Sequence, residues 1–375
     1  MTKYTFSVSK EQQPFEIAST MGCRTVNGAD INFKDSFRDT LKKIIKGEDV
    51  SHELKSANQK DGRGNIAPAT IILPTLAMEA KKKAERTKTD VVEEFMKILD
   101  KAIEDCALEL KERFEWICAQ NPASARFMYD NKTMFGYHEN EGIRSALKHG
   151  TLAIGQLGMA ECLQLLIGCD HTTEKGMKIA KRIEQLYKDR CAEYKEKYKL
   201  NYSNYFSPAE STCGTAMRKF KAKYGIIPNV SDHDYFTNSV HVPVWKEVTP
   251  FEKIDIESQL IPYSSAGSIC YVEVGDNAKN NLKGLEQIIK YAMDKDVSYM
   301  GINIPLSHCL KCGSDENIGF EDSCPICGAS TENIEHLARV TGYLSVDYRH
   351  MCSAKQSEVK QRYTHVNKLK NWKKQ

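Results

Sequence analysis

The stretches Cys309-Leu310-Lys311-Cys312 and Cys324-Pro325-Ile326-Cys327 decide how the C-terminal part of this chain folds. Eleven residues separate the two pairs, and a glycine follows each pair, at Gly313 and Gly328. This is the spacing of a zinc ribbon, in which each pair turns its backbone so that two thiolates face one ion. Glycine suits that tight turn. The sequence therefore predicts a closed four-cysteine zinc site that folds a loop and carries out no chemistry.

Composition narrows the class of protein. The chain has 375 residues, of which 41% are hydrophobic, enough for a large core and more than one domain. A net charge of +3 is too small to indicate binding to nucleic acid or to an acidic membrane. The sequence shows no membrane-spanning apolar run and no signal peptide. Thirteen cysteines outside a secreted context favour a reducing, cytoplasmic environment over a disulfide framework.

A second stretch, R-V-T-G-Y-L at residues 339–344, follows the cysteine pairs. Taken alone, a glycine at 342 in this otherwise apolar run indicates a turn that needs positive φ. Its position after the two cysteine pairs favours a second interpretation. The cysteine pairs and this stretch together resemble the C-terminus of the anaerobic (class III) ribonucleotide reductases. The resemblance continues through Lys355, Glu358, Arg362 and His365.

The resemblance implies a role for Gly342. In the family, the glycine of this motif carries a stable backbone radical. Only glycine does this easily, because its α carbon has no side chain and the radical delocalises into both flanking amides. The resemblance therefore implies that Gly342 is a glycyl radical site.

The N-terminal region supplies a candidate reactive thiol. Cys23 stands between a glycine and an arginine in the stretch M-G-C-R-T, which has neither helical nor strand periodicity. A lone cysteine is usually a small buried hydrophobe, but one in a loop beside a cation is a better candidate for reactivity. The stretch also resembles the finger loop of the family, which implies that Cys23 forms the thiyl radical.

Other segments match the family in order, with departures. G-R-G-N at 62–65 leads into a continuous apolar run at 69–74, which predicts a buried strand. The family usually has Asn where Ile72 stands and Arg where Thr75 stands, which puts the substrate or formate contacts at this spot in question. Residues 148–161 match another family stretch and are interpreted as a helix-rich piece in which Gly155 and Gly158 allow close backbone approach.

A polar segment, Y-F-T-N-S-V-H-V-P at 235–243, also matches the family. It has many hydrogen-bonding groups, and we weigh two roles for it evenly: substrate contact, or a hydrogen-bonded loop that ties two strands. A predicted strand at 299–304 delivers one more polar side chain. The candidate substrate-binding residues are Thr237, Asn238, Ser239, His241 and Asn303.

Periodicity places the regular elements between these motifs. Asp90 is expected to cap a long helix, with Glu93 completing a capping box. Apolar residues at three- and four-residue spacing continue that helix to Phe114, and the range 173–200 has a second amphipathic pattern. Strands at 269–274 and 299–304 flank a further helix. This alternation is typical of an α/β protein.

The resemblance implies an α/β fold that is the C-terminal half of a ten-stranded α/β barrel of the glycyl radical enzyme type. The chain begins about twenty residues before Cys23, so it looks like the C-terminal part of such an enzyme, either a split-gene product or a truncation. We expect a finger-loop region with an insertion over 1–66 and a half-barrel over 67–307. The zinc ribbon then covers 308–330, and a glycyl radical domain with a basic tail covers 331–375.

The implied reaction follows the family. A separate iron–sulfur activase that uses S-adenosylmethionine makes the radical at Gly342, which passes to Cys23. The thiyl radical starts reduction of a ribonucleoside triphosphate to its 2′-deoxy form, usually with formate as reductant, in an assembled homodimer that includes an N-terminal half. The alternatives are another glycyl radical enzyme, although those lack a four-cysteine ribbon beside the glycine, or a non-catalytic zinc-binding half-barrel subunit.

Overall fold

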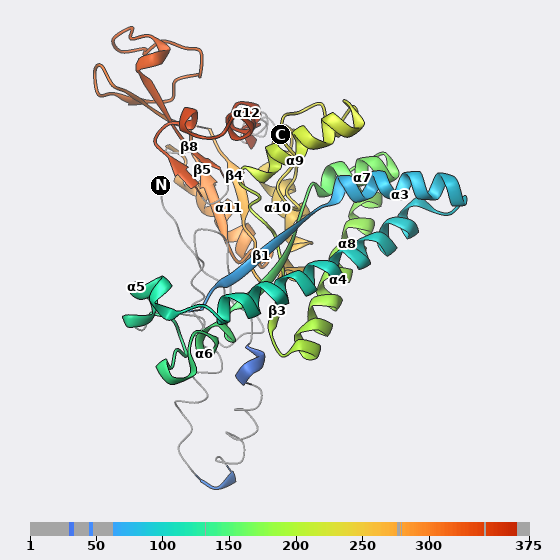
Figure 1. Cartoon of the computed structure of the whole chain (residues 1–375). Helices are drawn as coiled ribbons and strands as arrows, with labels where there is room; N and C mark the ends of the chain where they lie inside the picture. The colour runs from blue at the N-terminus through green and yellow to red at the C-terminus, as the bar shows by residue number, and fades with distance from the viewer. Residues whose placement is uncertain are drawn as a thin grey trace.

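The computed structural model describes residues 30–33, 45–47, 63–131, 133–275, 278, 280–340 and 343–365 (Figure 1). Cys23 and Gly342 lie outside the described residues. The described part alternates strands and helices, and the prediction of an α/β fold is confirmed.

Three parallel strands form the first sheet, in the order β1-β2-β3. Their bounds are β1 (Asn65–Ile72), β2 (Thr151–Leu157) and β3 (Asn201–Tyr205). All residues of β2 and β3 are buried, as expected of parallel strands that are covered on both faces. Helix α4 (Val91–Cys118) packs on β1, and α8 (Glu174–Tyr198) packs on β3, so both long helices lie along the sheet (Figure 1).

Helices α4 and α8 follow the predicted stripes. The core-facing residues of α4 include Phe95, Leu99, Ile103, Leu110 and Phe114, all fully buried. Asp90 caps α4 as predicted, because its carboxylate accepts from the backbone N of Val92 (2.9 Å) and of Glu93 (3.0 Å). The predicted capping box is wrong: the Glu93 carboxylate instead accepts from Arg182 Nη2 on α8, at 2.8 Å.

Two predictions along the sheet need correction. The strand expected at 69–74 begins earlier and ends at Ile72. Helix α3 (Leu73–Thr87) starts directly after it. A proline stands in the first turn of this helix, where a backbone N–H would have no partner within the helix, so the missing N–H of proline costs nothing. The helix-rich piece expected at 148–161 is strand β2 followed by helix α7 (Met159–Ile167). A continuous apolar run has no period, so it does not distinguish a buried strand from a buried helix.

The predicted close approach of the backbone at Gly155 is confirmed. A Cβ added there would lie 2.8 Å from the carbonyl oxygen of Tyr205 on β3. Gly158 caps the start of α7 with φ of +79°, a conformation that a side chain would strain. The turn from β2 into α7 therefore requires glycine, and it places the first turn of α7 beside the loop that contains residues 235–243.

The second half of the described chain contains two more sheets. Strands β4 (Cys270–Glu273) and β5 (Met300–Asn303) pair in parallel, with α11 (Leu282–Asp294) between them in sequence, as predicted. Backbone bonds from Ala266 N to Asn204 O (3.0 Å) and from Phe206 N to Gly267 O (3.3 Å) tie the segment before β4 to the end of β3.

The last sheet is antiparallel, in the order β7-β6-β8-β9. Its strands are β6 (Leu306–Cys309), β7 (Asp315–Glu316), β8 (Ile334–Val340) and β9 (Tyr343–Ser345). In Figure 1 the loops between β6 and β8 extend away from the rest of the molecule at the upper left.

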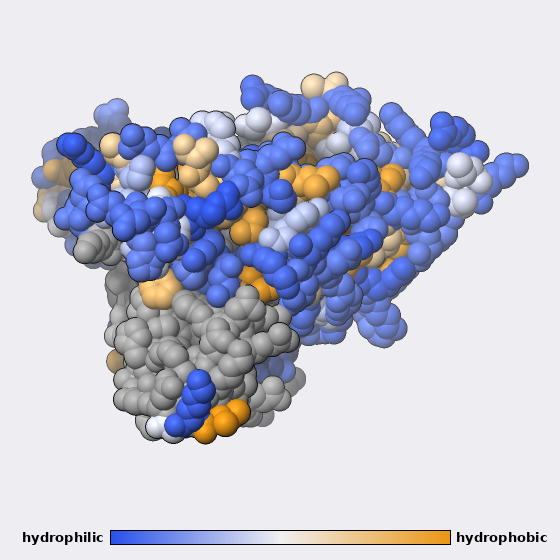
Figure 2. Space-filling view, turned by 60° about the horizontal axis from the view of Figure 1, so that its bottom comes forward, coloured by the Kyte–Doolittle hydropathy of each residue, from blue (hydrophilic) through white to orange (hydrophobic). Residues whose placement is uncertain are grey.

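The remaining helices connect these sheets. They are α5 (Arg126–Asp130), α6 (Arg144–Leu147), α9 (Thr212–Tyr224), α10 (Pro250–Ser258) and α12 (Ser353–Gln361). Short 3-10 turns lie at Ile31–Phe33, Pro122–Ala125, Glu139–Glu141, Ile261–Tyr263, Thr331–Asn333 and Tyr348–His350. Among the described helices, none is long and apolar enough to cross a membrane. Hydrophilic residues dominate the face in Figure 2, with hydrophobic ones scattered between them.

Candidate functional site

The four cysteines of the two C-x-x-C pairs converge. Their sulfur atoms all lie within 4.8 Å of one another, and Cys309 Sγ is 3.7 Å from Cys327 Sγ, as is Cys312 Sγ from Cys324 Sγ. A tetrahedral zinc ion with bonds of about 2.3 Å to sulfur places its ligands about 3.8 Å apart. The four residues therefore fit a zinc ion, and the predicted convergence of the cysteines is confirmed.

Each cysteine pair sits on a turn that glycine closes. Gly313 N donates to Cys309 O (2.8 Å), and Gly328 N donates to Cys324 O (2.9 Å). Both glycines have positive φ, at +73° and +69°. The backbone of the two turns thus follows from the C-x-x-C-G pattern itself.

A cavity with an empty volume of about 520 Å³, part of it open to solvent, lies between the 235–243 loop, α10, β4 and the end of the described chain. Its wall consists of Tyr235, Thr237, Asn238, His241, Val242, Val244, Lys253, Tyr271, Glu273, Glu358, Arg362 and His365. Three of the predicted substrate-binding residues lie on this wall: Thr237, Asn238 and His241. We refer to this cavity as the central pocket.

The 235–243 loop is held by side chains from neighbouring elements. Thr237 donates through both its backbone N (2.8 Å) and its Oγ1 (2.7 Å) to Glu161 Oε1 at the start of α7. Burial raises the pKa of Glu161 to about 7, and the Thr237 contacts oppose that rise. With its amide oriented to satisfy both ends, Asn238 donates to Pro208 O (2.8 Å) and accepts from Lys355 Nζ (3.0 Å).

Two other predicted residues are not among the residues that line the central pocket. Ser239 is fully buried with φ of +51°, and its carbonyl accepts from Met159 N at 3.2 Å. Asn303, at the end of β5, donates from Nδ2 to Glu273 Oε1 at 2.8 Å. In the described structure, Ser239 holds the backbone of the 235–243 loop, and Asn303 holds Glu273, which is on the pocket wall.

Ion pairs that are buried or half-buried lie at the wall of the central pocket, each with at least one member on that wall. Lys253 Nζ donates to Glu257 Oε1 on α10 (2.5 Å), and Lys355 Nζ donates to Glu358 Oε2 on α12 (2.6 Å). Arg362 contacts Glu273 Oε1 (3.1 Å) and Glu358 Oε1 (3.3 Å). Each of these cations has a carboxylate partner, so the pocket offers hydrogen-bonding groups without a strong net field for an anion.

The pocket is joined to the glycine-containing stretch by Arg362. Its Nη1 donates to the carbonyl oxygen of Arg339 at 2.7 Å. Arg339 in turn donates from Nη2 to Tyr299 Oη (3.1 Å). Its guanidinium carbon also lies over the ring of Tyr271, 5.5 Å from the ring centroid. The backbone that leads to residue 342 is therefore anchored at the pocket wall.

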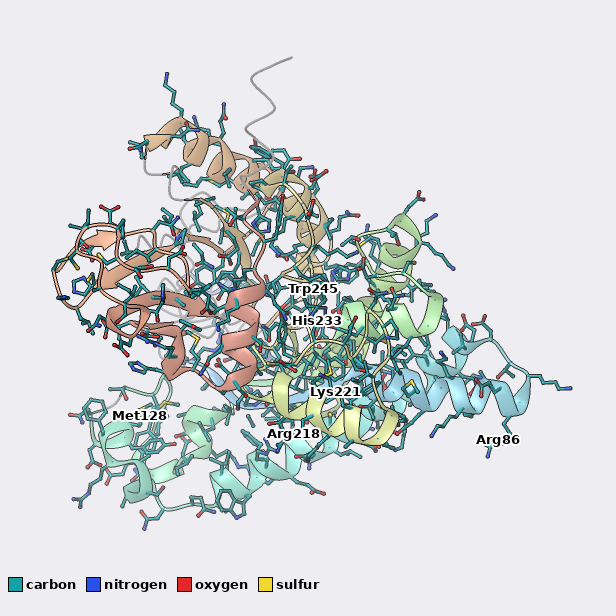
Figure 3. All side chains as sticks on the ribbon, turned by 90° about the horizontal axis from the view of Figure 1, so that it is seen from above. Arg86, Met128, Arg218, Lys221, His233 and Trp245 are labelled. Atoms are coloured by element: carbon teal, nitrogen blue, oxygen red, sulfur yellow. The ribbon has the colours of Figure 1, made fainter. Side chains whose placement is uncertain are left out.

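The end of α12 is also fixed to the 233–245 segment. Gln361 Oε1 accepts from Tyr235 Oη (2.8 Å) and lies 3.1 Å from His233 Nδ1. The ring of His233 stacks on Trp245, with centroids 3.7 Å apart, and the two are side by side near α9 in Figure 3. Side chains from two distant regions of the sequence thus meet at the end of α12.

Sequence reasoning missed several residues of the pocket wall. Lys253 and Glu257 stand four residues apart on α10, a spacing common on exposed helix faces, and nothing in the sequence marks the pair as buried. The helix itself has a readable start, because Thr249 and Glu252 form a capping box before its first turn. That signal predicts the helix but not the role of its buried charges.

Comparison with solved structures defines the fold. One anaerobic ribonucleotide reductase aligns with a TM-score of 0.63 at 19% identity, over 81% of this chain and 46% of that chain. A reductase from Thermotoga maritima in complex with dATP and CTP aligns with a TM-score of 0.58 at 19% identity, over 79% and 44%. The fold therefore resembles that of somewhat less than half of an anaerobic ribonucleotide reductase chain.

The sequence comparisons define the family. Residues 1–365 match the family model for anaerobic ribonucleoside-triphosphate reductase, and the chain belongs to this family. It is 31% identical to the Escherichia coli K12 enzyme of that name over 322 residues, 82% of this chain and 43% of the relative. It is 30% identical to the enzyme of phage T4 over 76% of this chain and 46% of the relative. The chain thus spans about half the length of these curated relatives.

Proposed function

We propose that this chain is the radical-bearing part of an anaerobic ribonucleoside-triphosphate reductase and forms the C-terminal half of its ten-stranded barrel. The observation that carries the proposal is the bond from Arg362, on the wall of the central pocket, to the carbonyl of Arg339, three residues before Gly342 (2.7 Å). The motif that would hold the radical is thereby tied to a pocket lined with hydrogen-bonding groups.

In this proposal, an iron–sulfur activase that uses S-adenosylmethionine generates the radical at Gly342, and Cys23 becomes the thiyl radical that takes the 3′ hydrogen of a ribonucleoside triphosphate. The 2′ hydroxyl leaves as water. Formate is oxidised to carbon dioxide and supplies two electrons, so that nucleotide, formate and one proton give deoxynucleotide, carbon dioxide and water. The four cysteines hold a structural zinc ion, and a complementary N-terminal half completes the enzyme.

Electron paramagnetic resonance after anaerobic activation of the assembled reductase tests this proposal. Gly342→Ala should abolish the radical signal, because a methyl group blocks the flat, delocalised geometry. The matched control is Gly275→Ala, which should keep the signal: among the described residues, its added Cβ would meet only Thr364 Cγ2, at an ordinary 3.7 Å. Cys23→Ser should keep the signal and lose deoxynucleotide formation.

Two outcomes would overturn parts of the proposal. A radical signal in the Gly342→Ala variant would show that the radical resides elsewhere. If the activated wild-type assembly shows no radical and forms no deoxynucleotide, the chain is better described as a non-catalytic zinc-binding subunit.

A further inference from the structure

One guanidinium group, that of Arg362, contacts three elements at the wall of the central pocket. Its Nη1 donates to Arg339 O on β8 at 2.7 Å and lies 3.1 Å from Glu273 Oε1 on β4. Its Nη2 lies 3.3 Å from Glu358 Oε1 on α12. Only 12% of the Arg362 side chain is exposed. Both terminal nitrogens of this guanidinium are therefore engaged with the protein.

The third nitrogen of the group, Nε, is buried and has no hydrogen-bond partner among the described residues. Arginine stays protonated in proteins, so the N–H of this nitrogen can only donate. A buried donor without an acceptor costs free energy, and folded proteins rarely leave one. Because Arg362 lines the central pocket, a ligand bound there can supply the acceptor.

The charges around Arg362 indicate which kind of acceptor fits. Arg362 already contacts two carboxylates, those of Glu273 and Glu358, and Glu358 is also paired with Lys355 at 2.6 Å. Within this group two cations face two carboxylates. An anion at Nε would be repelled by both carboxylates. A neutral oxygen, such as a sugar hydroxyl, accepts the N–H without adding charge.

We propose that Arg362 is a positioning residue that links the ligand of the central pocket to the strand leading to Gly342. Its Nε donates to a neutral oxygen of the ligand, a ribose hydroxyl under the proposed function, while Nη1 holds the carbonyl of Arg339. The guanidinium is a rigid plane, so its nitrogens do not move independently. Binding of the ligand therefore fixes the end of β8. The inference rests on the proposed reductase function for the identity of the ligand, but not for the hold on β8.

Helix α12 keeps the guanidinium in place. Glu358 divides its carboxylate, because Oε1 faces Arg362 and Oε2 accepts from Lys355 Nζ. Lys355 Nζ also donates to the side-chain oxygen of Asn238 at 3.0 Å, on the 235–243 loop. Lys355, Glu358 and Arg362 follow one another at three- and four-residue spacing, which places them on one side of the helix and its end. The loop, α12 and β8 thus form one connected set of polar contacts.

Hydrogen-exchange mass spectrometry of the assembled reductase at saturating nucleotide tests the link. The common ribonucleoside triphosphates are added one at a time, and at least one should slow exchange of the β8 amides, residues 334–340, by about threefold or more. Arg362→Lys keeps the charge but loses the planar group that spans the three contacts. In this variant, nucleotide should change the exchange by less than about 1.5-fold, and KM should rise while the radical signal stays.

Two results of this experiment would overturn the link. One is equal nucleotide-dependent slowing in the wild type and in Arg362→Lys. The other is a wild type whose β8 exchange does not respond to any of the nucleotides.

The matched control is Arg349→Lys. Arg349 also holds β8, because its Nη2 donates to Ile334 O at 2.7 Å, but it is not among the residues of the pocket wall. This variant should keep the nucleotide-dependent slowing. Loss of the slowing in both variants would mean that the response depends on any arginine that holds β8, and it would overturn the specific role of Arg362.

Measurements on the wild type alone keep the inference falsifiable if a variant fails to fold. Uncharged ribonucleosides at high concentration should slow exchange at 334–340 as the triphosphates do, because the acceptor is a neutral oxygen. Slowing by formate, with none by the ribonucleosides, would show that an anion takes the N–H of Nε and would overturn the proposed ligand chemistry.

Exchange without any ligand separates the inference from the proposed function. Ligand-free Arg362→Lys should exchange at 334–340 about threefold or more faster than the wild type, because the bond from Nη1 to Arg339 O is lost. Equal exchange in the two ligand-free proteins would overturn the hold of Arg362 on β8. Failure of the wild-type assembly to form deoxynucleotide would overturn the proposed function and leave this difference standing.

Discussion

The body of the molecule and its C-terminal segment are held together by different forces. In the body, the sheet β1-β2-β3 packs on α4 and α8 through fully buried residues such as Phe95, Leu99 and Tyr187. In the C-terminal segment, residues 306–365, the apolar cluster among the described residues is small and contains Cys309, Ile318, Cys324, Ala329 and Ile334. Helix α12 buries Ala354, Lys355 and Glu358 there.

This difference shows that the stability of the body depends on the total apolar area that is buried, whereas the stability of the C-terminal segment depends on particular pairs of residues. Apolar burial in the body is spread over many side chains, so each contributes a small share of the total. The C-terminal segment depends on four thiols that fit one metal ion and on a small set of buried or half-buried charges that are paired with one another. A single substitution should therefore do more harm in the C-terminal segment than in the body.

The largest effect is expected from the loss of the metal. We expect about one zinc per chain in the wild type and little in Cys312→Ser, with the β6–β8 region losing protection from hydrogen exchange. For structural zinc, binding free energy is folding free energy, and it amounts to about 10 kcal/mol or more. Elemental analysis and exchange mass spectrometry measure both effects. The control is Cys352→Ser, an exposed cysteine outside the cluster; a full zinc equivalent in Cys312→Ser would contradict the site.

The next effect concerns the charges under α12. Lys355→Met removes the nearer of the two cationic partners of Glu358 and leaves that buried carboxylate with Arg362 at 3.3 Å, which should cost about 3–5 kcal/mol of unfolding free energy. Urea unfolding measures this loss. The control is Lys360→Met on the same helix, whose ion pair with Glu321 is exposed and 3.8 Å long, and which should change little. Similar losses in the two variants would contradict the special role of the buried pair.

The body could be predicted from sequence where a periodic pattern existed. The stripes of α4 and α8 have the 3.6-residue period of a helix with one buried face, and both helices are found where expected. The sequence pattern does not separate β2 from α7, because residues that are buried on all sides show no period. The Glu93 capping box failed because a tertiary partner, Arg182, competes for the same carboxylate.

The candidate site was harder to predict from the sequence than the helices of the body. Cysteine spacing predicts the metal cluster because all four ligands lie within nineteen residues. The central pocket, in contrast, joins Thr237, Lys253, Glu273 and Arg362, which only the tertiary fold brings together. Sequence gives the residue types of such a set but not which of them share one cavity.

The body also contains a buried ionisable side chain, Glu184, whose contribution to the unfolding free energy should be smaller and should depend on pH. Burial raises the pKa of Glu184 to about 8, from a usual value of 4.5. The folded state therefore keeps a proton that the unfolded state has lost, and stability should fall as the pH rises from about 4.5 to 8. Relative to Glu184→Gln, the wild type should lose about 1.4 kcal/mol per pH unit in this range.

Urea unfolding of both proteins at pH 5.5 and 7.5 measures this difference. Glu93→Gln, which changes a half-exposed carboxylate paired with Arg182 on the surface of the same two helices, serves as the control and should follow the wild-type slope. Parallel pH dependences for wild type and Glu184→Gln would show that Glu184 is ionised in the folded state.

The smallest expected effect is at the start of α4. Asp90 accepts from two backbone N–H groups that have no partner within the helix, those of Val92 and Glu93. Asp90→Ala should therefore cost about 1 kcal/mol of unfolding free energy, while Asp90→Asn, which keeps the accepting oxygen, should cost less. Urea unfolding of the two variants at one pH measures both. Because α4 also has a long buried stripe, losing one cap should leave its position on β1 unchanged; a loss as large as that of Lys355→Met would show that the body, too, depends on single contacts.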